Sequence, residues 1–217
     1  MGEMTLWGAV SSRALRVHWA LIELGLEYEW VPTQSRSGET ETPEYCKLNP
    51  RRKIPTFQDG DLVMSESPAI VTYLAETYGT PENQLIPLEQ PARAKYFEWV
   101  SFVSMELDAT SLYVLRRHEG LPHIYGDAPQ ANKVCREYFD KMIKASAEDL
   151  TDGRHFLVGD QFTGADICMT TCIDWAERYE CALPGAWLKY RERVRARPSY
   201  AKAIAANALP DGKTQSA

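Results

Sequence analysis

Residues 49–79 read NPRRKIPTFQDGDLVMSESPAIVTYLAETYG, and their pattern gives the clearest indication of the fold. Two short apolar runs flank Asp59-Gly60, a dipeptide typical of tight hairpin turns. Ser67-Pro68 then predicts the start of a helix, with serine as the N-cap and proline in the first helical position. The stretch therefore predicts a β-hairpin followed by a helix that ends at a glycine.

The residues upstream of this stretch alternate strand and helix signals. Residues 4–10, MTLWGAV, form a short apolar run suited to a buried strand. Apolar residues at helical spacing follow over 14–24, and residues 28–31 read as a second strand. A polar loop leads into a short helix near 43–48. Residues 1–79 thus predict the order β-α-β-α-β-β-α.

The residues downstream of about 88 show helical periodicity and no strand pattern. Prolines punctuate residues 80–88, which predicts a linker, and residues 89–217 are expected to form an all-helical domain. The first long helix follows Pro91, and two shorter helices are expected near 186–196 and 199–207. The side chains expected on the inward face of the first long helix are Tyr96, Trp99, Val103, Leu107, Thr110 and Val114.

A further local signal in the helical part is a capping box at Thr163 and Asp166. The threonine caps the helix while the aspartate, three residues on, returns a bond to the backbone of the cap. Phe162 and Ile167 are placed as a hydrophobic staple. Asp166 and Asp174 are the charged residues between 164 and 176, so this helix is expected to be buried nearly all round.

The composition of the chain limits the kinds of molecule that the protein is expected to bind. The chain has 217 residues and a net charge of −6, which argues against nucleic acid because phosphate binding needs a basic face. Its uncharged stretches are too short to span a bilayer, and its first residues do not resemble a signal peptide. Five irregularly spaced cysteines predict free thiols in a reducing cytoplasm, and the pair Cys168 and Cys172 is read as buried apolar residues rather than metal ligands.

Four motifs together resemble the cytosolic glutathione S-transferase family, in its serine-type, bacterial-like form. They are Ser11-Ser12-Arg13-Ala14-Leu15-Arg16-Val17, Asn49-Pro50-Arg51-Arg52-Lys53-Ile54-Pro55, Ser65-Glu66-Ser67 and the box at Thr163 to Asp166. The resemblance covers essentially the whole chain. It implies an α/β thioredoxin-like N-terminal domain that binds glutathione, followed by an all-α domain that contributes the hydrophobic substrate site. It also implies a homodimer.

Ser11 and Ser12 are the candidate catalytic residues. A free thiol has a pKa near 8.5, so only about 3% is thiolate at pH 7. A hydroxyl at a helix N-terminus can supply the roughly 2.7 kcal/mol that moves this pKa to about 6.5. The resemblance favours Ser11, and Ser12 is the alternate. No tyrosine precedes Tyr28 and no cysteine precedes Cys46, so the tyrosine and cysteine types of this family match less well.

The resemblance also implies the residues that hold glutathione. Lys53 matches a lysine near the glycyl carboxylate, and Ile54, before a cis Pro55, should offer its backbone to the cysteinyl peptide. Glu66 is expected to pair with the γ-glutamyl amine and Ser67 with the carboxylate. Arg52 stands where the family has glycine, and it is expected either to add a second cation or to face solvent.

A second, hydrophobic substrate is expected in the cleft between the domains, against the first long helix of the second domain. The candidates come from the face turned away from the inward stripe: Ser104, Asp108, Ser111, Leu112 and Leu115. Weaker candidates are Tyr113, Arg116, His118, His123 and Tyr125.

The resemblance therefore implies a glutathione transferase acting on a hydrophobic electrophile in detoxification, without a metal. A glutathione-dependent lyase or isomerase, of the ether-cleaving or maleylacetoacetate type, is the enzymatic alternative. A non-catalytic glutathione-binding module is the alternative from another class. The dimer surface is expected on residues 57–78 and 91–147, with Phe57 as an anchor.

Overall fold

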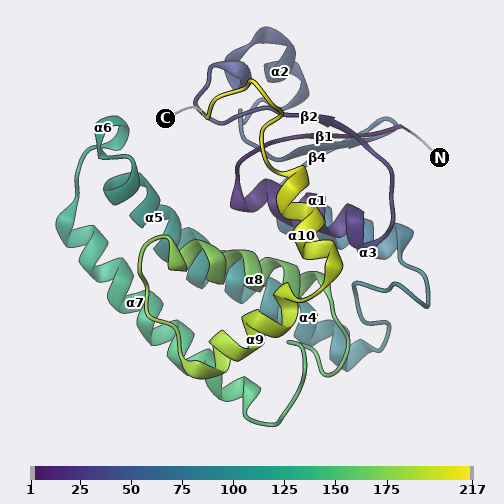
Figure 1. Ribbon diagram of the computed structural model, residues 1–217, viewed down its shortest axis with the longest axis vertical. Helices are drawn as coiled ribbons and strands as arrows, with labels where there is room; N and C mark the ends of the chain where they lie inside the picture. Colours follow the sequence, from purple (N-terminus) through teal and green to yellow (C-terminus); the bar gives the residue numbers. More distant parts are fainter. Residues whose placement is uncertain (1–2, 216–217) are drawn as a thin grey trace. The chain divides into compact units, whose positions relative to one another are not determined.

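A computed structural model describes residues 3–215 of the chain (Figure 1). By its contacts the chain divides into two compact units. Unit 1 contains the residues up to Ile86 together with the segment from Arg197, and unit 2 contains Pro87–Ala196. Among the described residues, no helix is long and apolar enough to cross a membrane.

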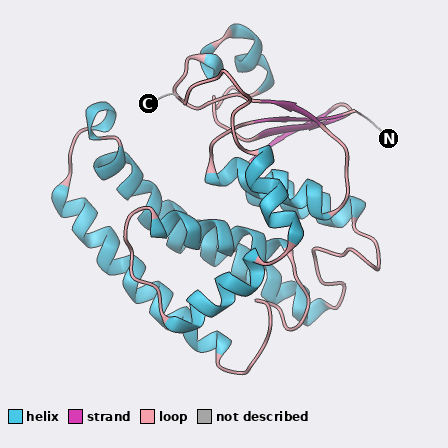
Figure 2. Ribbon diagram, viewed as in Figure 1, coloured by secondary structure: helices cyan, strands magenta, loops and turns pink. Residues whose placement is uncertain are grey.

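Unit 1 is built on a four-stranded mixed sheet (Figure 2). Its strands are β1 (Met4–Trp7), β2 (Glu29–Val31), β3 (Thr56–Asp59) and β4 (Leu62–Ser65), in the order β2-β1-β3-β4. β1 pairs parallel with β2 and antiparallel with β3, and β3 pairs antiparallel with β4. The predicted hairpin is therefore confirmed, with its turn between Asp59 and Leu62.

Helices cover the sheet of unit 1. They are α1 (Ser12–Glu23), α2 (Pro43–Leu48) with a preceding turn η1 (Glu39–Glu41), and α3 (Ser67–Tyr78). α1 packs against α3, and α2 lies on the opposite side of the sheet from both (Figure 1). The amphipathic face of α1 buries Val17 and Leu21 completely. The βαβαββα order, and with it the thioredoxin-like fold of the first domain, is confirmed.

The start of α3 corrects one detail of the sequence analysis. The helix begins at Ser67, so Glu66 occupies the N-cap position and Pro68 follows in the first turn. Glu66 makes no side-chain cap hydrogen bond, and its backbone has φ 71°. Ser67 is thus the first helical residue rather than the cap.

The C-terminal segment differs from the predicted division. α10 (Pro198–Ala206) packs along α1 within unit 1, whereas the sequence analysis assigned 89–217 to one helical domain. Trp19 explains this packing, because its indole N–H donates to Ser199 Oγ at 3.0 Å and its ring meets Tyr200 edge-on. Glu23 adds an ion pair with Arg197. Apolar periodicity alone does not say which domain a helix will join.

Unit 2 is helical over its described residues. Its long first helix runs through α4 (Gln90–Phe102), the π-helical segment η2 (Val103–Leu112), α5 (Tyr113–Leu115) and a second π-helical segment η3 (Arg116–Gly120). The short helix α6 (Pro122–Tyr125) follows, then α7 (Pro129–Ala147), η4 (Glu148–Leu150), α8 (Gly164–Glu177) and α9 (Gly185–Arg195). The expected all-helical C-terminal domain is confirmed in character.

The inward face of the first long helix is only partly as expected. Tyr96, Trp99, Val103 and Leu107 are buried, but Thr110 is exposed and Val114 is half-buried. A π-helix bonds residue i to i+5 and so takes more residues for each turn than an α-helix. From Leu107 onward the buried side chains are therefore Asp108, Ser111, Leu112 and Leu115. Helical periodicity predicted these four on the face turned away from the inward stripe, and that prediction is wrong.

α8 forms the centre of unit 2. Of Gly164–Ala176, Asp174 is the one residue that is not buried. The capping box is present, and the Asp166 carboxylate accepts from the N–H and hydroxyl of Thr163, at 2.8 and 2.9 Å. Its other oxygen accepts from Leu157 N–H at 2.9 Å and from Tyr190 Oη–H at 2.7 Å. The predicted capping element is confirmed, and it ties α9 and the preceding loop to α8.

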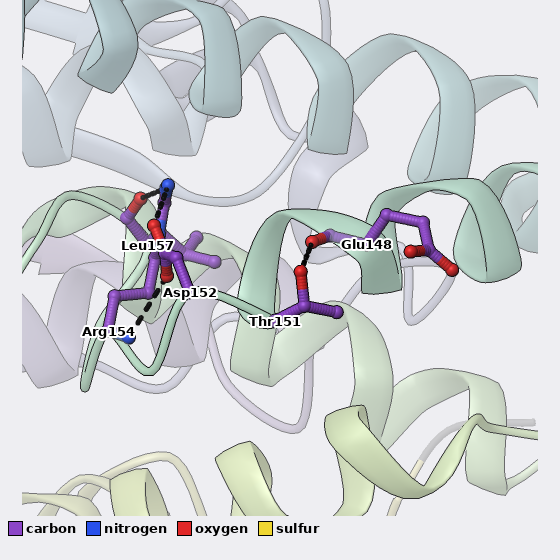
Figure 3. Close-up of polar contacts among 5 residues, drawn as sticks. All are labelled: Glu148, Thr151, Asp152, Arg154 and Leu157. Carbon is purple, nitrogen blue, oxygen red and sulfur yellow. Dashed lines mark hydrogen bonds and ion pairs between the residues drawn. The ribbon is translucent and has the colours of Figure 1, made fainter.

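The loop that leads to α8 is held by its own polar contacts (Figure 3). Thr151 donates to the Glu148 carbonyl at 2.7 Å, which ends η4. Arg154 pairs with Asp152 at 2.6 Å and donates to the Leu157 carbonyl at 3.1 Å. These bonds from Arg154 lower the pKa of Asp152 to about 2. Leu157 is thereby fixed on both sides, by Arg154 at its carbonyl and by Asp166 at its N–H.

Candidate functional site

The candidate site lies at one end of the sheet in unit 1. The strand register pairs Trp7 with Thr56, and Thr56 with Ser65. Three predicted segments therefore adjoin three neighbouring strands at the same end. They are the turn 8–11 after β1, the loop 49–55 before β3, and Glu66-Ser67 after β4.

These three segments lie close to one another. A Cβ atom at Gly8 would lie 3.5 Å from Ile54 Cβ and 3.6 Å from Pro55 Cα, so the first segment touches the second. Arg51 donates to Ser65 Oγ at 3.1 Å, and Ser65 directly precedes Glu66, so the second segment lies beside the third. The structure thus brings the predicted glutathione-binding residues together in one unit.

Ser11 occupies the N-cap of α1. Its backbone is extended, with φ −136° and ψ 131°, and its hydroxyl oxygen accepts from Ala14 N–H at 3.4 Å. Because the oxygen is the acceptor there, the hydroxyl hydrogen is available to an anion in front of the helix. Ser12 is the first residue of α1, and both serines are half-buried. The helix N-terminus adds a positive potential at the same place.

The turn that carries Ser11 has an unusual backbone. Gly8 has φ 149°, and Val10 has φ 49°, a left-handed conformation that costs a β-branched residue energy. Backbone bonds hold this shape, since Ala9 N–H donates to Thr33 O at 2.9 Å. Val10 N–H donates to Asn207 O at 2.8 Å. The end of α10 thus supports the residue before Ser11.

Buried side chains fix the backbone of the loop from Lys53 to Pro55. The Ile54-Pro55 bond is cis, as the resemblance implied. The Lys53 carbonyl accepts from Tyr45 Oη–H at 2.7 Å and from Asn49 Nδ2–H at 3.0 Å. Both groups also bond the buried Thr56 hydroxyl, at 2.9 Å each. This buried network orients the backbone of Lys53 and Ile54.

Lys53 and Arg52 differ in how their charges are used. The Lys53 ammonium is exposed, and it forms no ion pair or hydrogen bond with any of residues 3–215. The Arg52 guanidinium forms an ion pair with Glu41, and this contact raises the pKa of Arg52. Arg52 takes φ 54° at the position where the resemblance expects glycine, so it adopts the left-handed backbone at a steric cost.

Ser67 is buried at the N-terminus of α3, with 2% of its surface exposed. Its hydroxyl oxygen accepts from Arg16 Nη1–H at 3.4 Å. Arg16 is itself a buried cation on α1, 1% exposed, so it joins the helix of Ser11 to the helix of Ser67. Glu66, which precedes Ser67, is exposed. Its carboxylate forms no ion pair or hydrogen bond with any of residues 3–215.

Backbone strain gathers at this site. Val10, Arg52 and Glu66 are non-glycine residues with positive φ, and each directly precedes a predicted site residue: Ser11, Lys53 and Ser67. Such conformations cost about 1–3 kcal/mol each and occur preferentially where function requires them. This clustering supports the choice of segments.

The candidates for a second substrate lie in unit 2. Ser104 is half-buried and donates to the Val100 carbonyl at 2.7 Å, and the buried Ser111 donates to the Glu106 carbonyl at 3.0 Å. The side chains of Asp108, Leu112 and Leu115 are 2% exposed or less. The role of these five residues stays a prediction.

The weaker candidates lie at the end of the first long helix and just beyond it. The Arg117 guanidinium stands 5.1 Å from the ring centres of both Tyr113 and Tyr125, and His118 Nδ1 lies 2.8 Å from the Gly126 carbonyl oxygen. Arg116 is half-buried and His123 is exposed. Their role in substrate binding also stays a prediction.

Several residues at the site were given no role there by the sequence alone. Arg16 and His18 lie in the middle of a buried helix, and Tyr45, Asn49 and Thr56 form the network under Lys53. A cation within an apolar helix was a signal for Arg16, since buried arginines need partners. The network depends on side chains from α2 and β3, whose meeting is not visible in sequence.

A hollow of about 620 Å³ opens at the opposite end of β1, around Glu3, Met4 and residues 25–29. It is lined by none of the predicted site residues, so it is separate from the serine turn. Within residues 3–215 no group of three or more His, Cys, Asp or Glu side chains is arranged to hold a metal ion.

Comparisons with known proteins identify the family. The family model for the N-terminal domain of glutathione S-transferases matches residues 2–76, and the model for their C-terminal domain matches residues 99–198. Glutathione S-transferase 3 of Zea mays is 31% identical, over 100% of this chain and 100% of its own.

Solved structures give the same result over nearly the full length. A theta-class glutathione S-transferase from Xanthomonas axonopodis pv. citri, with glutathione bound, is 26% identical, with a TM-score of 0.79 over 94% of this chain and 98% of its own. A delta-class glutathione transferase from Nilaparvata lugens is 27% identical, with a TM-score of 0.81 over 94% of each chain. The serine-type, bacterial-like form stays a prediction. The resemblance to the family is confirmed, and the chain belongs to the glutathione S-transferase family.

Proposed function

We propose that this protein is a glutathione transferase in which the Ser11 hydroxyl stabilises the glutathione thiolate. The observation that carries the proposal is the position of Ser11 at the N-terminus of α1, with its hydroxyl hydrogen available. It stands at the end of the sheet where the strand register gathers the other two segments. The glutathione bound in the Xanthomonas relative supports the choice of ligand.

The chemistry follows from the stability of the thiolate. A hydrogen bond to a charged group contributes roughly 1.5–3 kcal/mol, and a helix N-terminus adds roughly 0.3–1 kcal/mol. Together these lower the thiol pKa by about two units, so most bound glutathione is thiolate at neutral pH. The thiol proton goes to solvent. The sulfur electron pair then forms the bond to an electrophilic carbon, and the leaving group departs with its own pair.

The remaining segments are proposed to bind the rest of glutathione. Lys53 attracts the glycyl carboxylate, and Ile54, before Pro55, offers backbone groups to the cysteinyl peptide. The Glu66 carboxylate pairs with the γ-glutamyl amine, and Ser67 binds the γ-glutamyl carboxylate at the N-terminus of α3. Lys53 is favoured over Arg52 as the cation, because Arg52 is engaged by Glu41.

The test is the pKa of the bound thiol, measured from the ultraviolet absorbance of the thiolate in protein saturated with glutathione. Ser11→Ala should raise this pKa by about one to two units, with little change in glutathione affinity. Ser12→Ala is the matched control and should leave it nearly unchanged. A larger rise in Ser12→Ala would transfer the role to Ser12. A native protein whose bound thiol titrates like free glutathione would instead indicate a non-catalytic binding module.

The acceptor is proposed to be a small hydrophobic electrophile, and the role to be cytoplasmic detoxification by a homodimer. Of the five predicted residues, the half-buried Ser104 is the proposed contributor to the acceptor site, because Asp108, Ser111, Leu112 and Leu115 are 2% exposed or less. A panel of aryl halides, enones, epoxides and β-aryl ethers separates transfer from isomerisation and ether cleavage. Turnover of the ethers alone, with release of the aryl alcohol, would favour a lyase.

A further inference from the structure

A buried histidine lies directly beneath the turn that carries Ser11. His18, on α1, has no exposed surface. Its Nε2 lies 3.3 Å from the Gly8 carbonyl oxygen, and its Nδ1 lies 2.7 Å from Tyr28 Oη. Trp30 packs edge-on against the imidazole and donates its indole N–H to the same Gly8 carbonyl at 2.9 Å.

We infer that His18 is a positioning residue for the thiolate-stabilising serine, acting through the Gly8 carbonyl. The inference rests on the function proposed for Ser11. According to this inference, the neutral imidazole of His18 fixes the peptide of Gly8. The position of that peptide then determines where the Ser11 hydroxyl points.

The hydrogen-bond partners determine which nitrogen carries the proton. A carbonyl oxygen only accepts, so His18 Nε2 must be the donor to Gly8. In a neutral ring Nδ1 is then the acceptor, and Tyr28 Oη–H donates to it. The result is a chain of bonds from Tyr28 through His18 to Gly8. Each hydrogen in this chain has one defined acceptor.

The surroundings keep both titratable groups in the required form. Burial lowers the pKa of His18 to about 4, although the bond to Gly8 acts in the opposite direction. Burial raises the pKa of Tyr28 to about 12. At neutral pH the histidine is therefore neutral and the tyrosine keeps its proton.

The Gly8 peptide is the point at which this chain can affect Ser11. Gly8 N–H donates to Val31 O at 3.1 Å, and its carbonyl takes the His18 and Trp30 donors, so the residue is fixed on both sides. A Cβ atom at Gly8 would lie only 3.0 Å from Ala14 Cβ, so the turn passes close to α1. Three residues further on, a small rotation of this peptide moves the hydroxyl relative to the sulfur. Misplacement by about 1 Å can cost a reaction as much as 100-fold.

The experiment compares His18→Phe, which keeps a ring but removes both hydrogen bonds, with His18→Gln, which restores a donor. His18→Phe should raise the pKa of bound glutathione by about one unit, toward the free thiol, with little change in KM for glutathione. His18→Gln should recover most of the shift. His155→Phe is the matched control, because His155 is an exposed histidine in unit 2, and it should leave the thiol pKa unchanged.

A double variant distinguishes positioning from a general loss of structure. If His18 acts through Ser11, then His18→Phe should add nothing further to the thiol pKa in a Ser11→Ala background. Equal and additive shifts, or an unchanged pKa in folded His18→Phe, would overturn the inference. If Ser11→Ala itself has no effect, the proposed function fails, and that result is separate from the outcome for His18.

The tautomer can be read in the unmodified protein, which protects the test against variants that do not fold. Long-range proton–nitrogen NMR correlations should show a single His18 proton on Nε2 at pH 7. They should also show its Nδ1 as an unprotonated acceptor. A proton on Nδ1 instead, or a doubly protonated ring, would reject the assignment whatever the variants do.

Discussion

Arg52 shows at the scale of one residue how the site uses strained backbone. Its φ of 54° is a conformation that glycine adopts freely and that other residues adopt at a cost. The ion pair with Glu41 is exposed and so offsets little of this cost. Other interactions in unit 1 must therefore offset the energy cost of the backbone conformation at Arg52.

Replacing Arg52 separates the strain from the charge. Both Arg52→Gly and Arg52→Ala remove the guanidinium, but only glycine relieves the backbone. We expect Arg52→Gly to be more stable than Arg52→Ala by about 1 kcal/mol in urea-induced unfolding. Equal stabilities would show that φ at this position is not the source of strain.

Ser67→Ala should weaken glutathione binding about tenfold, because one bond to a charged carboxylate is lost. The pKa of the bound thiol should hardly move, since Ser67 is proposed to contact the other end of the peptide. Calorimetry gives the dissociation constant, and thiolate absorbance gives the pKa. An unaltered dissociation constant in the folded variant would refute the role of Ser67.

His18 should also make the stability of the protein depend on pH. Its pKa falls from 6.5 to about 4 on folding, so the unfolded chain binds this proton more readily. Stability from His18 is therefore complete above pH 6.5 and is lost as the pH falls toward 4, by about 3 kcal/mol in total. Denaturant unfolding of the native protein and His18→Gln over this range isolates the term, because other acidic groups are common to both. Parallel curves would contradict it.

At the scale of the element, α8 depends on one carboxylate. Asp166 accepts four hydrogen bonds in a fully buried place, where burial raises its pKa and the bonds oppose that rise. Its removal leaves donors on Thr163, Leu157 and Tyr190 without an acceptor. Such a loss acts on the fold of unit 2, whereas the segments proposed to bind glutathione belong to unit 1.

We expect Asp166→Ala to lower the free energy of unfolding by about 3 kcal/mol or more, and Tyr190→Phe, which removes one of the donors, by about 1 kcal/mol. Chemical denaturation measures both. The folded Asp166→Ala protein should keep a normal pKa of bound thiol. A changed thiol pKa at undiminished stability would assign Asp166 a role in the site.

The first long helix shows where periodicity fails as a guide. Its apolar spacing predicted the buried side chains correctly as far as Leu107. Beyond it, Thr110 and Ser111 hydroxyls donate to carbonyls five residues back, at 2.6 and 3.0 Å. This widened turn moves Asp108 and Ser111 into the buried face. Hydropathy carries no signal for a π-helix, because the change lies in the backbone register and not in the residue types.

The candidate site was predictable where local motifs define it. Ser11, Lys53 and Ser67 follow from short stretches whose backbone form is set by neighbours in sequence. The bonds from Arg16 to Ser67 and from His18 to Gly8 join positions that only the packed fold brings together. The bond from Val10 N–H to the Asn207 carbonyl joins two positions far apart in the sequence, and no periodic pattern indicates it.

At the scale of the whole molecule, the expected homodimer needs a revised anchor. Phe57 has no exposed surface because it lies in the core of unit 1, so it cannot anchor an interface as the sequence analysis proposed. Leu62 and Val63, on the neighbouring strand β4, are 43% and 40% exposed. β4 is an edge strand, and exposed apolar residues there favour association.

Light scattering at micromolar concentration should give a mass near twice 24.6 kDa. Val63→Lys should shift the mass toward the monomer, because it puts a charge into the proposed interface. Leu188→Lys, at a comparably exposed leucine on α9, is the matched control. A native mass near 24.6 kDa would exclude the dimer.

The bond between Val10 and Asn207 has a consequence for the order in which the protein is made. A ribosome releases the serine turn early and Asn207, which completes it, much later. The nascent chain can form its sheet and its first helices, but the peptide before Ser11 has no acceptor until α10 emerges and docks on α1. The serine turn is therefore completed long after it is synthesised, and the proposed ability to lower the pKa of a bound thiol should arise only after α10 has docked on α1.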